Sequence, residues 1–97
     1  MVRHIVLLRW TETATEQQKQ DAEKAFHSLP EKVSQIQKLV CGADLALTPG
    51  AHDFAAVLDF ASADDWRAYQ AHEAHKAMIA EYLAPILAER SVIQFDV

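Results

Sequence analysis

The segment Val2-Arg3-His4-Ile5-Val6-Leu7-Leu8-Arg9-Trp10 predicts the β-strand from which the rest of the fold can be worked out. Successive side chains of a strand point to opposite sides of its sheet. One face carries Val2, His4, Val6, Leu8 and Trp10, and the other carries Arg3, Ile5, Leu7 and Arg9. Both faces are apolar in the middle, so we expect protein to cover this strand on both sides.

The segment after this strand predicts a helix. Thr15-Glu16-Gln17-Gln18 has the spacing of a capping box, in which the first and last side chains bond to each other's backbone N–H groups. Pro30 has no backbone N–H and is predicted to end the helix, with a short helical turn carrying Val33 and Ile36 after it. The residues predicted to face the core are Ala22, Ala25, Phe26 and Leu29.

Two strands are predicted in the middle of the chain, over residues 38–47 and 52–60, because apolar side chains alternate there. Thr48-Pro49-Gly50 supplies the turn between them. Gly42 indicates a β-bulge or a close approach to the backbone. Alternation over residues 90–97 predicts a last strand at the end of the sequence.

A second long helix is predicted between the third and fourth strands. Ser62 is a suitable N-cap, and Asp64 and Asp65 complement the positive end of the helix dipole. The helix is expected to run on toward Tyr82, with a break before Pro85. The element order is therefore βαββαβ, which predicts an α+β protein with a four-stranded antiparallel sheet and both main helices on one face.

The other face of that sheet would be left bare, although the predicted strands are too apolar for it to meet water. A chain of 97 residues buries only about 60% of its unfolded surface, and its hydrophobic content of 51% leaves apolar surface for association. Two copies stacked sheet on sheet would cover both bare faces. We therefore expect a homodimer joined through the sheets.

Composition excludes several classes of function. The formal net charge is −5 and there is no run of Lys or Arg, so neither nucleic acid nor an anionic membrane is an expected partner. Arg9 interrupts the only apolar run near the start, and no segment reaches membrane-spanning length. Cys41 is the only cysteine, which excludes an internal disulfide. We expect one domain and a cytoplasmic location.

The candidate functional segment is Tyr69-Gln70-Ala71-His72-Glu73-Ala74-His75, which brings a phenol and two imidazoles together. At about 100° per residue, His72 and His75 lie on the apolar helix side that carries Ile79 and Leu83. Ionisable groups on an apolar face lose hydration free energy unless they find partners. That loss indicates a site, although imidazoles held by backbone carbonyls would be a structural explanation.

A pocket beside this segment is therefore predicted. His4 lies on the core face of the first strand and would add a third inward imidazole. An imidazole can take a proton from a carbon next to a carbonyl, and a phenol can stabilise the resulting enolate in a dry pocket. The predicted ligand-binding residues are His72, Trp66, Ile79 and Leu83.

In order and spacing, these features resemble the stress-responsive A/B barrel (Dabb) family. The resemblance rests on His4-Ile5-Val6-Leu7-Leu8, a second strand containing Gly42, the segment Phe54 to Phe60 before the helix, Tyr69-x-x-His72-x-x-His75, and the closing Val92-Ile93-Gln94-Phe95-Asp96. It implies that residues 1–97 form a single Dabb domain with a ferredoxin-like fold, which dimerises into an α+β barrel.

The family includes a polyketide cyclase that works without metal or organic cofactor. The resemblance to it implies that His75 is a general base, that Tyr69 hydrogen-bonds the carbonyl or developing oxyanion, and that His4 completes the catalytic set by lining the pocket. A proline commonly follows the first His of the family motif, and Glu73 stands there in this sequence. The helix is therefore free to run straight on, which would turn His75 away from the angle that the cyclase uses.

Several functions stay open at this point. The sharpest is an internal pocket for an apolar or polyketide-like small molecule, with cofactor-free cyclase or lyase-like chemistry. The alternatives are a non-catalytic, stress-related binding or assembly protein and a cofactor-free monooxygenase of the antibiotic-biosynthesis type. A metal site built from His4, His72 and His75 is disfavoured, because His-Glu-x-His is one residue shorter than the zincin spacing. No cofactor and no metal are predicted.

Overall fold

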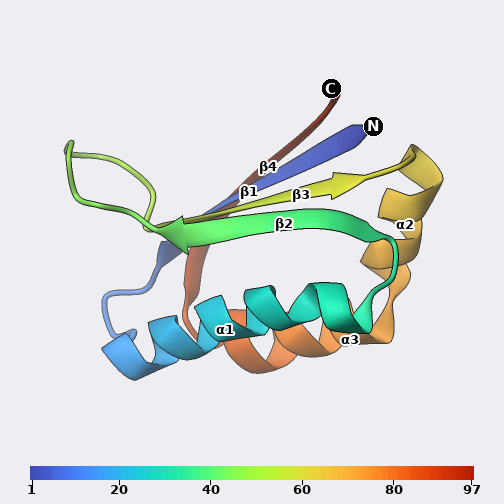
Figure 1. Cartoon of the computed structure of the whole chain (residues 1–97). Coiled ribbons are helices and arrows are strands. Elements are labelled where there is room, and N and C mark those ends of the chain that lie inside the picture. Colours follow the sequence, from blue (N-terminus) through green and yellow to red (C-terminus); the bar gives the residue numbers. More distant parts are fainter.

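A computed structural model describes residues 1–97 and contains the predicted βαββαβ order, with the second helical region divided into three parts (Figure 1). A π-helical turn, η1, follows the last of the helices. The elements are β1 (Val2–Trp10), α1 (Glu16–Lys32), β2 (Ile36–Ala43), β3 (Phe54–Phe60), α2 (Ala63–Ala71), α3 (Glu73–Met78), η1 (Ile79–Leu83) and β4 (Leu87–Asp96).

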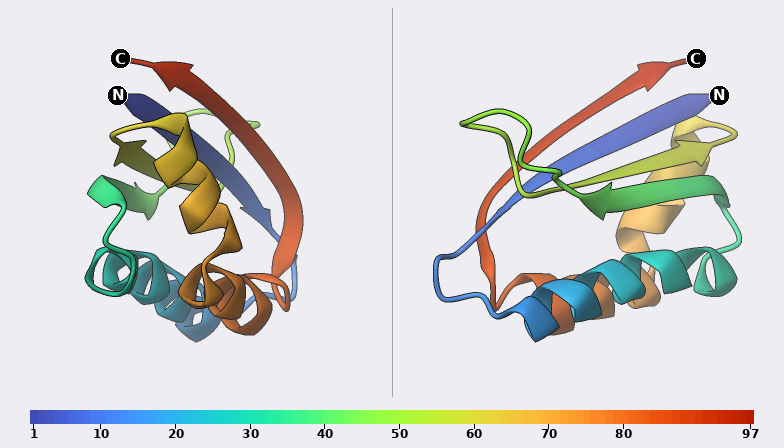
Figure 2. Two further views of the ribbon diagram at one scale, coloured as in Figure 1. Left: turned by 90° about the vertical axis from the view of Figure 1, so that its right-hand side faces the viewer. Right: turned by 60° about the vertical axis from the view of Figure 1, so that its left-hand side comes forward.

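The four strands form one antiparallel sheet in the order β2-β3-β1-β4, which confirms the ferredoxin-like fold. The helices lie on one side of this sheet and leave its other side open (Figure 1, Figure 2). The end of β4 extends beyond the helices beside the start of β1, and the Val97 N–H donates to the Met1 carbonyl at 2.9 Å. The last strand, β4, is thus an edge strand of the sheet and pairs with the first strand, β1.

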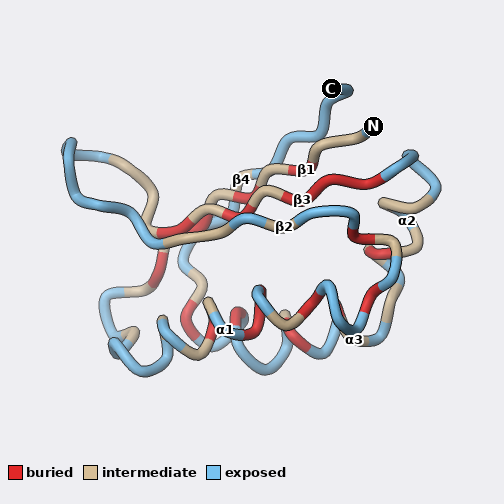
Figure 3. The backbone as a smooth tube through the Cα atoms, viewed as in Figure 1, coloured by how far each residue is buried: buried red, intermediate tan, exposed pale blue.

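The core lies between the helices and the sheet, where buried segments of both layers face each other (Figure 3). Val6, Leu8 and Trp10 are buried, as predicted for one face of the first strand. Phe26 of α1 stacks on Phe54 of β3 with ring centroids 5.3 Å apart. The Thr15 capping box is present in the structure, which confirms the predicted start of α1.

The open face of the sheet carries an apolar row across all four strands. Val40, Val57, Ile5 and Ile93 are register partners on neighbouring strands, and Val40 and Ile93 are 55% and 57% exposed. Next to the row, Arg3 donates two hydrogen bonds to Asp59, at 2.9 and 3.0 Å. This is the bare apolar face that the sequence predicts.

The prediction that Pro30 ends the first helix was wrong, because α1 continues through it to Lys32. The continued helix keeps Leu29 and Val33 in the core, and the Val33 N–H donates to the Leu29 carbonyl at 2.8 Å. A proline inside a helix costs about 3 kcal/mol, and burying an apolar side chain returns about 1.5 to 3 kcal/mol. Two such side chains therefore offset the lost backbone hydrogen bond.

The middle strands are shorter than predicted. β2 begins at Ile36 and ends at Ala43, so the expected helical turn at Ile36 is absent. The register irregularity of β2 lies between Ile36 and Lys38, and not at Gly42. Residues 44–53 form a loop that projects from the sheet (Figure 1). No helix in the structure combines the length and the apolar character that crossing a membrane requires.

The predicted continuous second helix was also wrong, because the chain leaves helical geometry at His72. His72 has φ −70° and ψ 137°, an extended conformation that ends α2 and begins α3. Its Nδ1 accepts a hydrogen bond from the Ala74 N–H at 3.0 Å. Farther on, the Ala84 N–H donates to the Ile79 carbonyl at 2.8 Å, the five-residue spacing of a π turn.

Candidate functional site

Three rings from three elements meet between the helices and the sheet. Tyr69 comes from α2, His75 from α3 and His4 from β1, and their exposed fractions are 1%, 7% and 4%. The Tyr69 and His75 ring centroids are 4.2 Å apart, and those of His4 and Tyr69 are 6.3 Å apart. All three predicted catalytic side chains thus lie inside the protein and close together.

The break at His72 is what aims His75 inward without a proline in the motif. The His72 ring caps α3 through Ala74, and α3 then presents His75 and Met78 to the core. Glu73 is the first residue of α3, and proline is common at the first position of a helix because no helical hydrogen bond is lost there. In this chain the His72 side chain caps α3 and the helix breaks at His72, so the expected continuous helix through Glu73 is not formed.

Burial keeps both inward imidazoles neutral. Loss of hydration lowers the pKa of His4 to about 4, with further lowering by His75 and Arg90. Loss of hydration also lowers the pKa of His75, and an interaction with the backbone of Gln70 opposes that shift. Burial raises the pKa of Tyr69 well above its usual value. The site therefore holds two unprotonated bases and one phenol that keeps its proton.

The polar atoms of these rings differ in their partners. Nδ1 of His4 lies 2.8 Å from Nε2 of Gln94, its cross-strand neighbour on β4. An amide NH2 group donates, so Nδ1 accepts and the neutral His4 ring carries its proton on Nε2. Nδ1 of His75 is buried and has no hydrogen-bond partner. An unpartnered buried nitrogen is costly, which favours a partner that is not part of the chain.

A small cavity lies among these groups, with a volume of about 20 Å³. That is room for about one water molecule. Ile79 and Leu83 line it, as predicted, and all three catalytic candidates line it too. The full lining is His4, Val6, Phe26, Tyr69, Gln70, His75, Met78, Ile79, Leu83 and Arg90.

Two of the predicted ligand-binding residues lie outside this lining. His72 is half-buried and uses its Nδ1 in the helix cap. Trp66 packs against His4 with ring centroids 6.0 Å apart, and its indole nitrogen is buried without a hydrogen-bond partner. Trp66 therefore supports the His4 ring from outside the lining, whereas His72 positions α3. Ligand contact by either residue stays a prediction.

Sequence reasoning missed the polar residues that complete the site. Gln70 and Arg90 line the cavity, and Gln94 holds His4. Alternation within the last strand already places Arg90, Val92 and Gln94 on one face. Combined with pairing of the first and last strands, which the ferredoxin-like order implies, that alternation would have brought Gln94 to His4.

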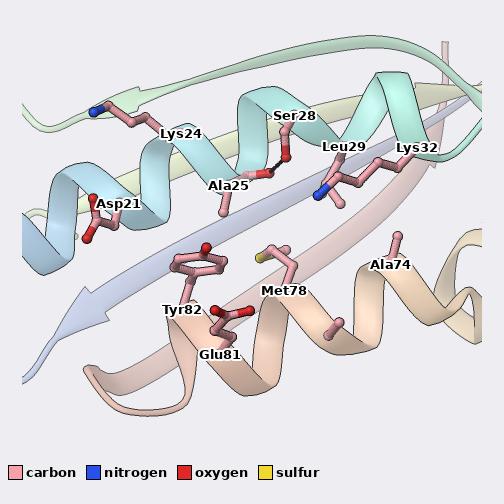
Figure 4. Close-up of a pocket in the computed structure, with 11 residues that line it drawn as sticks. Asp21, Lys24, Ala25, Ser28, Leu29, Lys32, Ala74, Met78, Glu81 and Tyr82 are labelled. Carbon is pink, nitrogen blue, oxygen red and sulfur yellow. Dashed lines mark hydrogen bonds between the residues drawn. The ribbon is translucent and has the colours of Figure 1, made fainter.

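A larger hollow lies elsewhere, in a groove between α1 and the α3–η1 segment, with a volume of about 480 Å³ (Figure 4). Lys24, Lys32 and Glu81 line it at the surface, and Ser28 donates its hydroxyl to the Ala25 carbonyl at 2.8 Å. None of the inward imidazoles reaches this groove. No three His, Cys, Asp or Glu side chains gather anywhere in the structure as a metal ligand set would.

The sequence profile of the stress responsive A/B barrel domain matches residues 2–97. The chain belongs to the Dabb family. This Dabb protein is also similar in structure to a dimeric ferredoxin-like protein of unknown function from Thermobifida fusca YX. The two share 41% identity with a TM-score of 0.91, over 99% of this chain and 90% of the other. None of the curated proteins matches the chain.

Two more distant structures share the fold. A dimeric ferredoxin-like protein of unknown function from Bacteroides fragilis NCTC 9343 is 27% identical, with a TM-score of 0.82 over 99% of this chain and 95% of the other. Hydroxynitrile lyase from Passiflora edulis is 18% identical, with a TM-score of 0.87 over 99% of this chain and 92% of the other. The similarity to the lyase is one of fold alone.

Proposed function

We propose that this Dabb protein is a homodimer whose internal site binds the carbonyl end of a small, largely apolar molecule and performs cofactor-free acid–base chemistry on it. The observation that carries the proposal is the 4.2 Å approach of the Tyr69 and His75 rings at a void inside the core. We further propose that residues 1–97 act as one domain in the cytoplasm.

The homodimer part of the proposal is supported from two directions. The structurally similar proteins from Thermobifida fusca and Bacteroides fragilis are both described as dimeric. The open sheet face of this chain also carries the apolar row of Val40, Val57, Ile5 and Ile93. A contiguous apolar surface of this kind marks an interaction site.

The chemistry that these groups support is enolisation. A ring nitrogen of His75 takes the proton from a carbon next to the carbonyl. The C–H electron pair becomes the C=C bond of the enolate, and the carbonyl π pair moves onto the oxygen. The buried Tyr69 hydroxyl, which keeps its proton because burial raises its pKa, donates to that oxygen. The proton then returns to carbon or to a leaving group. Positioned acid–base groups contribute factors of about 10² to 10⁴ each.

The test is exchange of the activated CH2 protons of acetoacetamide for deuterium, followed by ¹H NMR in D2O. We expect acceleration over buffer by the wild-type protein and loss of about a hundredfold or more of it in His75→Gln and Tyr69→Phe. His27→Gln and Tyr82→Phe are matched controls, because both residues lie outside the cavity lining. Equal exchange in wild type and His75→Gln would refute the proposal.

The size of the void favours a second candidate, a binding or assembly protein without catalysis. A cavity of about 20 Å³ admits a ligand only if side chains such as Ile79 and Leu83 move. This candidate replaces the first if the wild-type protein shows no exchange activity and if His75→Gln and Tyr69→Phe both lower the melting temperature. A monooxygenase of the antibiotic-biosynthesis type is a third hypothesis, which dioxygen uptake with phenolic compounds would reveal.

A further inference from the structure

Three of the four arginines in this chain are held by carboxylates. Arg3 pairs with Asp59 at 2.9 Å, Arg9 with Glu89 at 3.2 Å and Arg67 with Asp64 at 2.8 Å, and each pair includes a hydrogen bond. The fourth, Arg90, has neither an ion pair nor a side-chain hydrogen bond.

This unpaired arginine is the one that lines the cavity between His4, Tyr69 and His75. In the antiparallel register, Arg90 is the partner of Leu8, which is completely buried on the helix-facing side of the sheet. Arg90 itself is exposed, whereas every other residue of the lining is buried or half-buried. Arg90 is therefore the member of the lining that is most accessible to solvent, and it lies on the side of the sheet opposite to the proposed dimer contact.

No carboxylate of the chain pairs with Arg90. The lining contains no carboxylate, and its titratable neighbours are the two neutral imidazoles and the protonated phenol. Arg90 lines the same cavity as both imidazoles, and its charge lowers the pKa of His4 and of His75. The chain has 14 acidic residues against 9 basic ones, and none of the acidic side chains forms an ion pair with Arg90.

We propose that Arg90 is a specificity residue that binds a carboxylate of the ligand, so that the ligand class is a small oxo-acid. This inference rests on the proposed function, because the carbonyl of the oxo-acid would lie between Tyr69 and His75. A planar guanidinium can hold both carboxylate oxygens, which fixes the orientation of the molecule. Neutralising the carboxylate also removes the repulsion that a second negative charge would exert on a forming enolate.

The experiment compares acetoacetate with acetoacetamide, two compounds of nearly equal size that differ in charge. Binding of each is measured by ¹⁵N–¹H NMR titration of the wild-type protein, with shifts expected at Tyr69, His75 and Arg90. We expect acetoacetate to bind about tenfold tighter than the amide, the ratio that one charge-assisted hydrogen-bonded contact provides.

Variants at the arginines decide whether Arg90 causes that preference. Arg90→Gln is expected to remove the preference, because it should lower acetoacetate affinity about tenfold and acetoacetamide affinity much less. Arg90→Lys should keep part of the preference, because lysine keeps the charge without the planar fork. Arg67→Gln is the matched control, since its guanidinium is exposed and paired with Asp64. It should keep the full preference.

Equal wild-type affinity for the two probes, a preference that survives in Arg90→Gln, or no binding of acetoacetate up to its solubility limit would each overturn the inference. These outcomes separate it from the proposed function. Deuterium exchange that depends on His75 without any charge preference would support the acid–base chemistry and reject the role of Arg90. A charge preference without exchange would support the oxo-acid site and reject catalysis.

Discussion

Gln94 lies 2.8 Å from Nδ1 of His4, although ninety positions separate the two residues in the chain. The contact joins β1 to β4 on the side of the sheet that faces the helices. Because His4 is buried, loss of the amide would leave a ring nitrogen without a partner. The bond therefore stabilises the fold and also fixes the tautomer of an imidazole that lines the cavity.

The first prediction concerns this bond. Gln94→Leu should lower the free energy of unfolding by about 1 to 3 kcal/mol, the cost of an unsatisfied buried polar atom. Urea titration followed by tryptophan fluorescence measures it. Gln17→Leu is the control, because its hydrogen bond to Asp21 is exposed and its loss should cost less than about 0.5 kcal/mol. Equal losses in both variants would contradict the argument.

The second prediction is a pH dependence of stability. His4 titrates near 6.5 when unfolded and at about 4 when folded, so the unfolded chain binds more protons between these values. The free energy of unfolding should be highest above about pH 6.5 and should fall by about 1 to 2 kcal/mol by about pH 5. The pKa of His75 is also lowered, so His75 acts in the same direction.

Urea titrations at both pH values test this, in the wild type and in His4→Gln. The variant should lose a large part of the difference between the two pH values. His27→Gln should keep it, because His27 is exposed. If removing His4 leaves the pH dependence unchanged, the buried neutral imidazole is not its origin.

The third prediction concerns the helix break. His72 already has the extended ψ of 137° that a residue before proline adopts, and Glu73 is the first residue of α3. Glu73→Pro should therefore be tolerated, with unfolding free energy unchanged or raised by up to about 1 kcal/mol. Thermal denaturation measures the effect. Lys76→Pro should instead cost about 3 kcal/mol, since the Lys76 N–H donates to the His72 carbonyl.

The fourth prediction uses two adjacent residues that face opposite sides of the sheet. Ile93 belongs to the apolar row on the open face, whereas Val92 pairs with Val6 on the helix side. Ile93→Asp would bury a charge in the proposed dimer and should weaken association by at least about a hundredfold, as loss of about 3 kcal/mol implies. Sedimentation velocity measures it. Val92→Asp should stay dimeric, and dissociation of both variants alike would place the interface elsewhere.

The main elements of the fold could be predicted from sequence because their signals are local. Alternation in Val2–Trp10 and the capping box at Thr15 are both found in the structure. Pro30 misled the prediction, since the burial of Leu29 and Val33 outweighs a missing hydrogen bond. Tertiary packing of this kind cannot be read from a proline alone.

The candidate site was predictable in part. Periodicity placed His72 and His75 on the apolar side with Tyr69 at its edge, and the structure buries Tyr69 and His75 but leaves His72 half-buried. The cap formed by His72 escaped prediction, because imidazole is an unusual helix cap. Arg90 also escaped it, because its place in the site follows only when the alternation of the last strand is combined with the pairing of the first and last strands. The size of the void depends on how side chains of the helices and the sheet pack, which no local pattern gives.

The π turn at Ile79–Leu83 has a consequence for how this site could change over time. Such a turn accommodates one residue more than a regular α-helix. Deleting one residue there should restore regular α-helix and leave the residues on either side in place, whereas deleting one residue within α3 should rotate the preceding residues by about 100°. The turn is therefore a point at which the chain can change length while His75 keeps its position relative to β4.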